Sequence, residues 1–75
     1  MKEALMYIIG SLVENPRDVK LGVSEDGDVV RFKLTVASSD RGKVIGKEGR
    51  VVKSIRTVMQ TAAARLSKRV YLDID

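Results

Sequence analysis

The hydrophobic residues of this chain follow two different spacings, and the order of those spacings restricts the possible folds more than any other feature. In residues 3–14 they recur every three or four positions, which is the pattern of an amphipathic helix. The residues of this stripe are Leu5, Ile8, Ile9, Leu12 and Val13. The dipeptide Asn15-Pro16 then predicts the end of the helix, because a residue before proline disfavours helical backbone.

Two segments with strict alternation follow. Hydrophobic residues alternate with polar ones at Val19, Leu21 and Val23, and again at Val30, Phe32, Leu34 and Val36. Between them, residues 25–28 (Glu-Asp-Gly-Asp) have the composition of a turn. We therefore expect two strands, each with one buried face.

A helical spacing then returns in two pieces. Residues 38–40 (Ser-Ser-Asp) offer side-chain oxygens that can cap a short helix over residues 41–45, which Gly46 ends. A second helix is expected from about Gly49, with hydrophobic residues at Val51, Val52, Ile55, Val58, Met59, Ala62, Ala63 and Leu66. These cover an arc of roughly 140°, which is wider than packing on a sheet requires.

The last segment alternates again, because Val70, Leu72 and Ile74 are separated by polar or aromatic residues. The element order is thus helix, strand, strand, helix, helix, strand, which indicates an α+β fold. No linker, repeat or low-complexity segment interrupts the order, and 75 residues suffice for one small core. We expect a single domain over residues 1–75.

The composition argues against several functional classes. The chain has no cysteine and no histidine, so disulfides, thiolate metal sites and the commonest general base are all absent. We therefore expect no enzyme activity, no metal and no cofactor. No hydrophobic run approaches the roughly 20 residues of a membrane span, and the amino terminus lacks the order of a signal peptide. The expected compartment is the cytoplasm.

The positive charge is concentrated in one quarter of the chain. Residues 38–56 contain six basic and two acidic residues, a balance of +4, whereas residues 1–37 balance to −1 and residues 57–75 to +1. The basic residues of the cluster are Arg41, Lys43, Lys47, Arg50, Lys53 and Arg56. Such a cluster is expected where a polyanion docks, and a basic surface that is merely solvated is the alternative.

Within this cluster, residues 46–49 (Gly-Lys-Glu-Gly) join the two expected helices. Glycine has no Cβ, so it adopts positive φ easily and lets another backbone approach closely. The unpaired amides at the start of the second helix favour an anion such as phosphate. Beside this loop, the hydrophobic residues expected to line a shallow groove for unstacked bases are Val44, Ile45, Val52 and Ile55. Their alternative role is to pack the helices onto the sheet.

Residues 44–52 resemble the signature of KH domains, in which a hydrophobic pair precedes a G-x-x-G loop and a hydrophobic residue follows the second glycine by three positions. The element order over residues 1–75 looks like the type II, bacterial form of the fold, with helices packed on one face of a three-stranded sheet. Residues 41–50 are similar to the KhpA family of freestanding single-KH proteins. That resemblance implies a cytoplasmic, dimeric RNA chaperone. It also implies pairing with itself and with KhpB, a larger KH-domain protein, in control of cell shape and cell wall biogenesis.

The site implied by the motif and its charges is a single-stranded RNA clamp. The residues expected to contact RNA are Arg41, Lys43, Val44, Ile45, Gly46, Lys47, Glu48, Gly49, Arg50, Val52 and Lys53. The Glu48 carboxylate is expected to lower the affinity because it lies where phosphates pass. A dimer interface is expected near Val58 and Ala62, with Tyr7 or Tyr71 as contributors.

Three other readings compete with this one. A DNA-binding helix-turn-helix also joins two helices by a short turn, but the second helix here begins Arg-Val-Val-Lys at residues 50–53, with little base-reading chemistry. Residues 42–48 are similar to a P-loop, yet the spacing is one residue short and Glu48 stands where Ser or Thr would hold magnesium. The third reading is a dimerisation module whose nucleic-acid binding is incidental.

Overall fold

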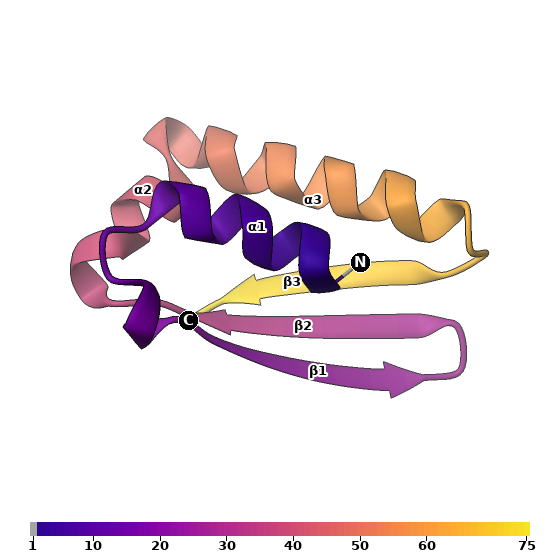
Figure 1. Ribbon diagram of the computed structural model, residues 1–75. Helices are drawn as coiled ribbons and strands as arrows, with labels where there is room; N and C mark the ends of the chain where they lie inside the picture. The colour runs from indigo at the N-terminus through magenta and orange to yellow at the C-terminus, as the bar shows by residue number, and fades with distance from the viewer. Residues whose placement is uncertain (1) are drawn as a thin grey trace.

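The computed structural model describes residues 2–75. Its α-helices are α1 (Lys2–Leu12), α2 (Arg41–Ile45) and α3 (Arg50–Ala64), its strands are β1 (Lys20–Asp26), β2 (Val29–Thr35) and β3 (Arg69–Ile74), and its 3₁₀-helices are η1 (Pro16–Asp18), η2 (Ser38–Asp40) and η3 (Lys47–Gly49). Figure 1 shows α1 and α3 over one face of the sheet, and none of the described helices lies over the other face. The expected α+β class, element order and one-sided helix layer are confirmed. None of the helices in residues 2–75 has both the length and the hydrophobicity needed to cross a membrane.

The sheet has the order β1-β2-β3, so β2 is its central strand. Strands β1 and β2 are antiparallel, with Lys20 opposite Thr35 and Asp26 opposite Val29. Strand β3 runs parallel to β2, because the chain crosses from one end of the sheet to the other through α2 and α3. The β1–β2 turn contains Gly27 at a φ of 58°, a conformation that glycine adopts with little strain.

The core lies between β2, β3 and the helix layer. Its buried side chains are Leu5, Ile9, Val30, Phe32, Leu34, Val36, Val44, Ile55, Met59, Ala63, Val70 and Leu72. They come from the hydrophobic positions of the two spacings described above, since a strand buries every second residue and a helix buries one stripe. The core therefore fixes which face of each strand remains in solvent.

Strand β1 differs from expectation. It was predicted to have one buried face, but Val23 is 45% exposed and Leu21 is only half-buried, so the prediction is wrong for this strand. The physical reason is its position at the edge of the sheet, where the helices over β2 and β3 do not cover it (Figure 1). Alternation alone does not distinguish an edge strand from a central one.

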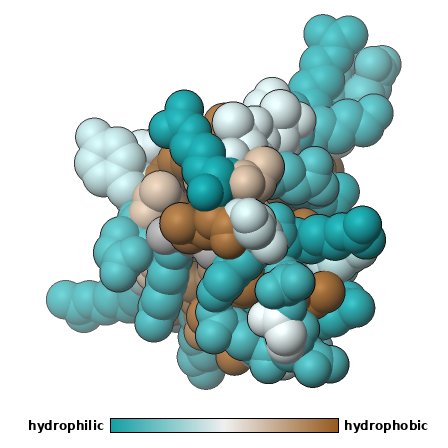
Figure 2. All heavy atoms as spheres, turned by 90° about the vertical axis from the view of Figure 1, so that its right-hand side faces the viewer, coloured by the Kyte–Doolittle hydropathy of each residue, from teal (hydrophilic) through white to brown (hydrophobic). Residues whose placement is uncertain are grey.

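Helix α3 has more hydrophobic surface than the core uses. Its residues Val52, Ile55, Met59 and Ala63 are buried, whereas Val58 is 51% exposed. Leu66, just beyond the helix, is also largely exposed. At the end of the molecule where the β1–β2 turn and the α3–β3 loop lie, the surface is mainly hydrophilic with a small hydrophobic patch (Figure 2). The core therefore covers only part of the hydrophobic surface of α3 and the residues just beyond it.

Candidate nucleic-acid interface

The loop between α2 and α3 begins at a glycine that no other residue can replace without a clash. Gly46 has a φ of 77° and ends α2 by donating its N–H to the Gly42 carbonyl oxygen at 2.8 Å. A Cβ built on Gly46 would lie 2.3 Å from Cγ2 of Val51. Both the backbone angle and the available space therefore require glycine at this position.

The second half of the loop turns through two consecutive left-handed residues. Glu48 has a φ of 57° and Gly49 a φ of 74°, and the chain then enters α3 at Arg50. A Cβ at Gly49 would meet only Cγ1 of Val52, at 3.9 Å, so this position needs glycine for its angle and not for space. Glu48 is a non-glycine residue in the same region and carries backbone strain.

The first turn of α3 is open to an anion. The helix has 15 residues, and no side chain among residues 2–75 caps its amino terminus. The Arg50 N–H donates to the Lys47 carbonyl oxygen, whereas the N–H groups that follow it in the first turn have no partner inside the helix, and the helix dipole adds a partial positive charge there. Arg50 is exposed, with its Nη2 atom 3.8 Å from Oε2 of the exposed Glu48. Such an exposed pair holds its partners weakly, which leaves Arg50 available. Lys47 and Lys53 are exposed on the same segment.

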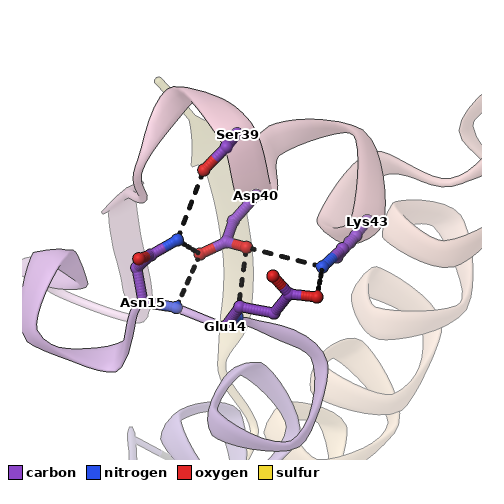
Figure 3. A network of polar contacts seen from close by, with 5 residues as sticks. All are labelled: Glu14, Asn15, Ser39, Asp40 and Lys43. Carbon is purple, nitrogen blue, oxygen red and sulfur yellow. Dashed lines mark hydrogen bonds and ion pairs between the residues drawn. The ribbon is translucent and has the colours of Figure 1, made fainter.

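A buried carboxylate fixes the other end of α2. Asp40 was expected, with its two serine neighbours, to cap this helix, but no side-chain cap bond forms and that expectation is wrong. Its Oδ1 atom instead accepts a hydrogen bond from the Glu14 N–H at 3.1 Å (Figure 3). Its Oδ2 atom accepts bonds from the backbone N–H and the side-chain amide of Asn15, at 3.0 and 3.1 Å. The carboxylate thus satisfies donors that follow α1, far away in sequence.

These contacts stabilise the ionised form of Asp40. The hydrogen bond from the Glu14 N–H is the largest influence lowering the pKa of the Asp40 carboxyl, and Asn15 and Lys43 lower it further, against the opposing effect of burial. Since Asp40 directly precedes α2, this network anchors the helix that leads into the glycine loop.

Lys43 belongs to the same network. Its Nζ atom lies 2.5 Å from Oε1 of Glu14 and 4.0 Å from Oδ1 of Asp40. Figure 3 shows this ammonium group turned toward the two carboxylates. Arg41 is exposed on the first turn of the same helix. Lys43 is therefore a predicted RNA-contacting cation whose charge is already paired at short range, in contrast to the longer Arg50–Glu48 pair.

The predicted hydrophobic groove beside the loop does not form from the four residues named for it. Val44 is fully buried, and Val52 and Ile55 are 7% and 4% exposed, while Ile45 is half-buried. Val44 packs the helix layer onto the sheet, which is the alternative role named for it, and its contact with RNA stays a prediction. The hydrophobic spacing of a helix reports burial but not which neighbour provides it.

A hydrophobic groove lies instead between α1 and α3. The residues lining it are Ile8, Leu12, Arg50, Val51, Ser54, Ile55 and Val58. Sequence reasoning missed it because it depends on α1 packing beside α3, two helices that are distant in sequence. The only available signal was the excess width of the hydrophobic arc of α3. Of the two residues predicted at a dimer interface, Val58 lines this groove and Ala62 is half-buried.

A second hollow lies beside the free edge of β3. Its lining residues are Gln60, Lys68, Arg69, Val70 and Tyr71, none of which was predicted as an RNA contact. Nearby, Arg56 donates from Nε and Nη2 to the Leu72 carbonyl oxygen at 3.2 and 2.9 Å. One cation of the basic cluster therefore binds the edge of the sheet.

Comparison with known proteins agrees with this geometry. A family model described as the KH domain of KhpA/KhpB matches residues 2–74. The protein named RNA-binding protein KhpA in Chlamydia trachomatis serovar D is 45% identical over 74 residues, which cover 99% of this chain and 95% of that protein. The RNA-binding protein KhpA of Oceanobacillus iheyensis is 43% identical over 74 residues, which cover 99% of this chain and 99% of that protein.

A solved structure supports the fold. Aquifex aeolicus Era, crystallised with GDP·AlF4⁻, superposes with a TM-score of 0.66 over 96% of this chain and 28% of that protein, at 23% identity. At this identity the likeness concerns the fold alone. The matching family model and the near full-length relatives lead to one conclusion. The chain belongs to the KhpA/KhpB family of KH domains.

Proposed function

We propose that the chain binds single-stranded RNA through residues 46–49 and the amino terminus of α3. The observation that carries the proposal is the uncapped start of α3, presented by two left-handed residues and flanked by Lys47 and Arg50. Backbone N–H groups at such a helix start are a known anion-binding arrangement. Membership of a KH family, whose relatives are named RNA-binding proteins, supports RNA as the polyanion.

In this proposal the loop residues have separate tasks. Gly46 and Gly49 let a sugar-phosphate backbone approach the chain closely, and Lys47, Arg50 and Lys53 contact its phosphates. Half-buried Ile45 and buried Val52 offer little surface for bases. Phosphate contacts position a strand without reading its sequence. We therefore expect weak sequence preference and a strong dependence of affinity on salt concentration.

The test is a titration of fluorescent single-stranded RNA with native protein and a Lys47→Ala, Arg50→Ala double variant. The matched control is Arg17→Ala with Arg65→Ala, which removes the same charge from two exposed positions in η1 and after α3. We expect the loop variant to lose affinity by about tenfold or more and the control by roughly twofold. Equal losses in both would reject a local clamp. Substituting Gly46 is a poorer test because of its clash with Val51.

A second proposal concerns self-association. The groove between α1 and α3 is almost entirely hydrophobic, and Val58 on its rim is 51% exposed. We propose that it pairs with a second copy of the chain or with the KH domain of a larger KhpB-type protein. Pairing two weak RNA sites would raise their affinity through effective concentration. Roles as an RNA chaperone and in cell shape and cell wall biogenesis stay part of this proposal and rest on the family resemblance.

A further inference from the structure

The face of the sheet that carries no helices has a basic centre. Because Val30, Phe32 and Leu34 are buried under the helices, the alternate residues of β2 point to the open side. Two of these are Arg31 and Lys33, both exposed. Figure 1 shows that no helix or strand of residues 2–75 covers this face. The central strand therefore presents two neighbouring cations to solvent, on a different face of the molecule from the glycine loop.

An aromatic ring lies beside these cations. Tyr71 of β3 stands opposite Arg31 in the sheet register and is 44% exposed. The Arg31 guanidinium carbon lies 4.8 Å from the centre of the Tyr71 ring, so the two groups make a cation–π contact. Unpaired bases stack on aromatic rings and on guanidinium planes. This pair thus combines a stacking surface with a positive charge.

The neighbouring strand leaves room next to both cations. In β1, Gly22 stands opposite Lys33 and Ser24 stands opposite Arg31. A Cβ added at Gly22 would only reach ordinary contact with Lys33, at 3.8 Å from its carbonyl oxygen, so the fold itself does not require glycine there. The pairing is continuous through this position, so no bulge explains it either. A glycine inside a strand lowers stability and often marks a close approach by a ligand.

The charges of this face favour a polyanion at its centre. Its cations are Lys20, Arg31, Lys33 and Arg69, and its acidic residues are Asp26 and Asp73. Within residues 2–75, no ion pair within 4.0 Å engages Arg31 or Lys33. Asp73 stands opposite Lys33 in the register without forming such a pair. The central cations are therefore available to an external partner.

We propose that the open sheet face is a second contact surface for single-stranded RNA. A base stacks on Tyr71 and Arg31, Lys33 binds a phosphate, and Gly22 allows the backbone to approach the sheet. The hollow at the free edge of β3 includes Tyr71 together with Gln60 of α3, so it connects the helix layer to this face. A longer strand can follow that path from one surface to the other. This inference does not depend on the glycine loop being a clamp.

RNAs of different length distinguish binding at the glycine loop alone from binding at both surfaces. An oligonucleotide of about four nucleotides fills a single clamp, whereas one of about 12 nucleotides can reach a second surface. We would titrate both lengths with native protein, Tyr71→Val and Lys33→Glu. Valine suits a strand and keeps the fold while removing the ring. The matched control for the charge change is Arg17→Glu, at an exposed residue of η1.

We expect Tyr71→Val and Lys33→Glu each to weaken binding of the longer RNA by about tenfold and to leave the shorter one within roughly twofold. If the native chain binds both lengths equally, or if Tyr71→Val binds the longer RNA like native protein, the sheet-face inference is overturned and the loop proposal stands. If a Lys47→Ala, Arg50→Ala variant binds the longer RNA as tightly as native protein and that binding still depends on Tyr71, the loop proposal fails and the sheet face stands. Equal losses in Lys33→Glu and Arg17→Glu would show general electrostatics only and reject the local phosphate contact.

Discussion

The backbone N–H of Glu14 donates a hydrogen bond to Oδ1 of Asp40 at 3.1 Å, which joins the segment after α1 to the residue before α2. Asn15 adds two bonds to the same carboxylate (Figure 3). The orientation of α2, and of the glycine loop that follows it, therefore depends on a carboxylate that is almost completely enclosed.

We predict that Asp40→Asn destabilises the protein at neutral pH. Each oxygen of the Asp40 carboxylate accepts a backbone hydrogen bond, one from Glu14 and one from Asn15. In either orientation, the new amide nitrogen would therefore face an N–H donor. The native pKa lies below the ordinary value of about 3.9, so the stabilisation is complete above that value and is lost as the pH falls through the native pKa. The urea midpoints of native and variant should differ at about pH 7 and converge as the pH falls through the native pKa of Asp40. Asp18→Asn, at an exposed residue, is the control, and a pH-independent difference would contradict this account.

Alanine at the two loop glycines should have unequal effects. At Gly49 the added methyl group has space, so only the left-handed angle costs stability, by about 1–2 kcal/mol. At Gly46 the same strain is joined by the clash with Val51, and the loss should exceed about 3 kcal/mol. Urea denaturation of both variants measures the difference. Equal losses would mean that the chain around Val51 moves aside.

Glycine in place of Ser67 should stabilise the protein. Ser67 has a φ of 57° at the carboxyl end of α3, where Lys68 donates its N–H to the Ala63 carbonyl oxygen at 2.9 Å. Glycine is preferred at such a left-handed helix end, so we expect a gain of about 0.5–1 kcal/mol. Ser54→Gly, inside the same helix, should lose a similar amount. Thermal unfolding measures both effects. If the unfolding temperatures of both variants shift in the same direction from that of native protein, the prediction is wrong.

We predict that Glu48→Gln tightens RNA binding by about threefold, because a negative charge some 6 Å from a phosphate costs roughly 0.7 kcal/mol in water. The Glu48 side chain is 70% exposed and pairs only loosely with Arg50, so its removal should not disturb the fold. Fluorescence titration against Glu25→Gln, a control at an exposed residue of β1, measures the effect. An unchanged affinity would show that this carboxylate points away from the bound strand.

If the groove between α1 and α3 is an interface, Val58→Asp should make the protein monomeric, since a charge there opposes burial. The control is Thr57→Asp, because Thr57 is exposed and does not line the groove. Sedimentation velocity of both variants, with circular dichroism to check helix content, gives the answer. A dimer that persists in Val58→Asp would move the interface to another surface.

The periodicities determined which segments become helices and strands, because each secondary structure buries side chains at its own fixed repeat. The positions of Gly46 and Gly49 likewise predicted the loop between α2 and α3, since positive φ values favour glycine. Local sequence was sufficient for these features because local sterics decide them.

Tertiary structure alone decided which surfaces are covered. Val44 went into the core, Val23 remained in solvent at a sheet edge, and Asp40 bound the chain after α1 instead of capping α2. Each outcome depends on which distant segment packs against a residue. The spacing of hydrophobic residues along the chain does not identify that segment. The sequence thus determined the elements and the loop, whereas the packing of α1 and α3 over β2 and β3 determined the groove, the anchored carboxylate and the open basic face.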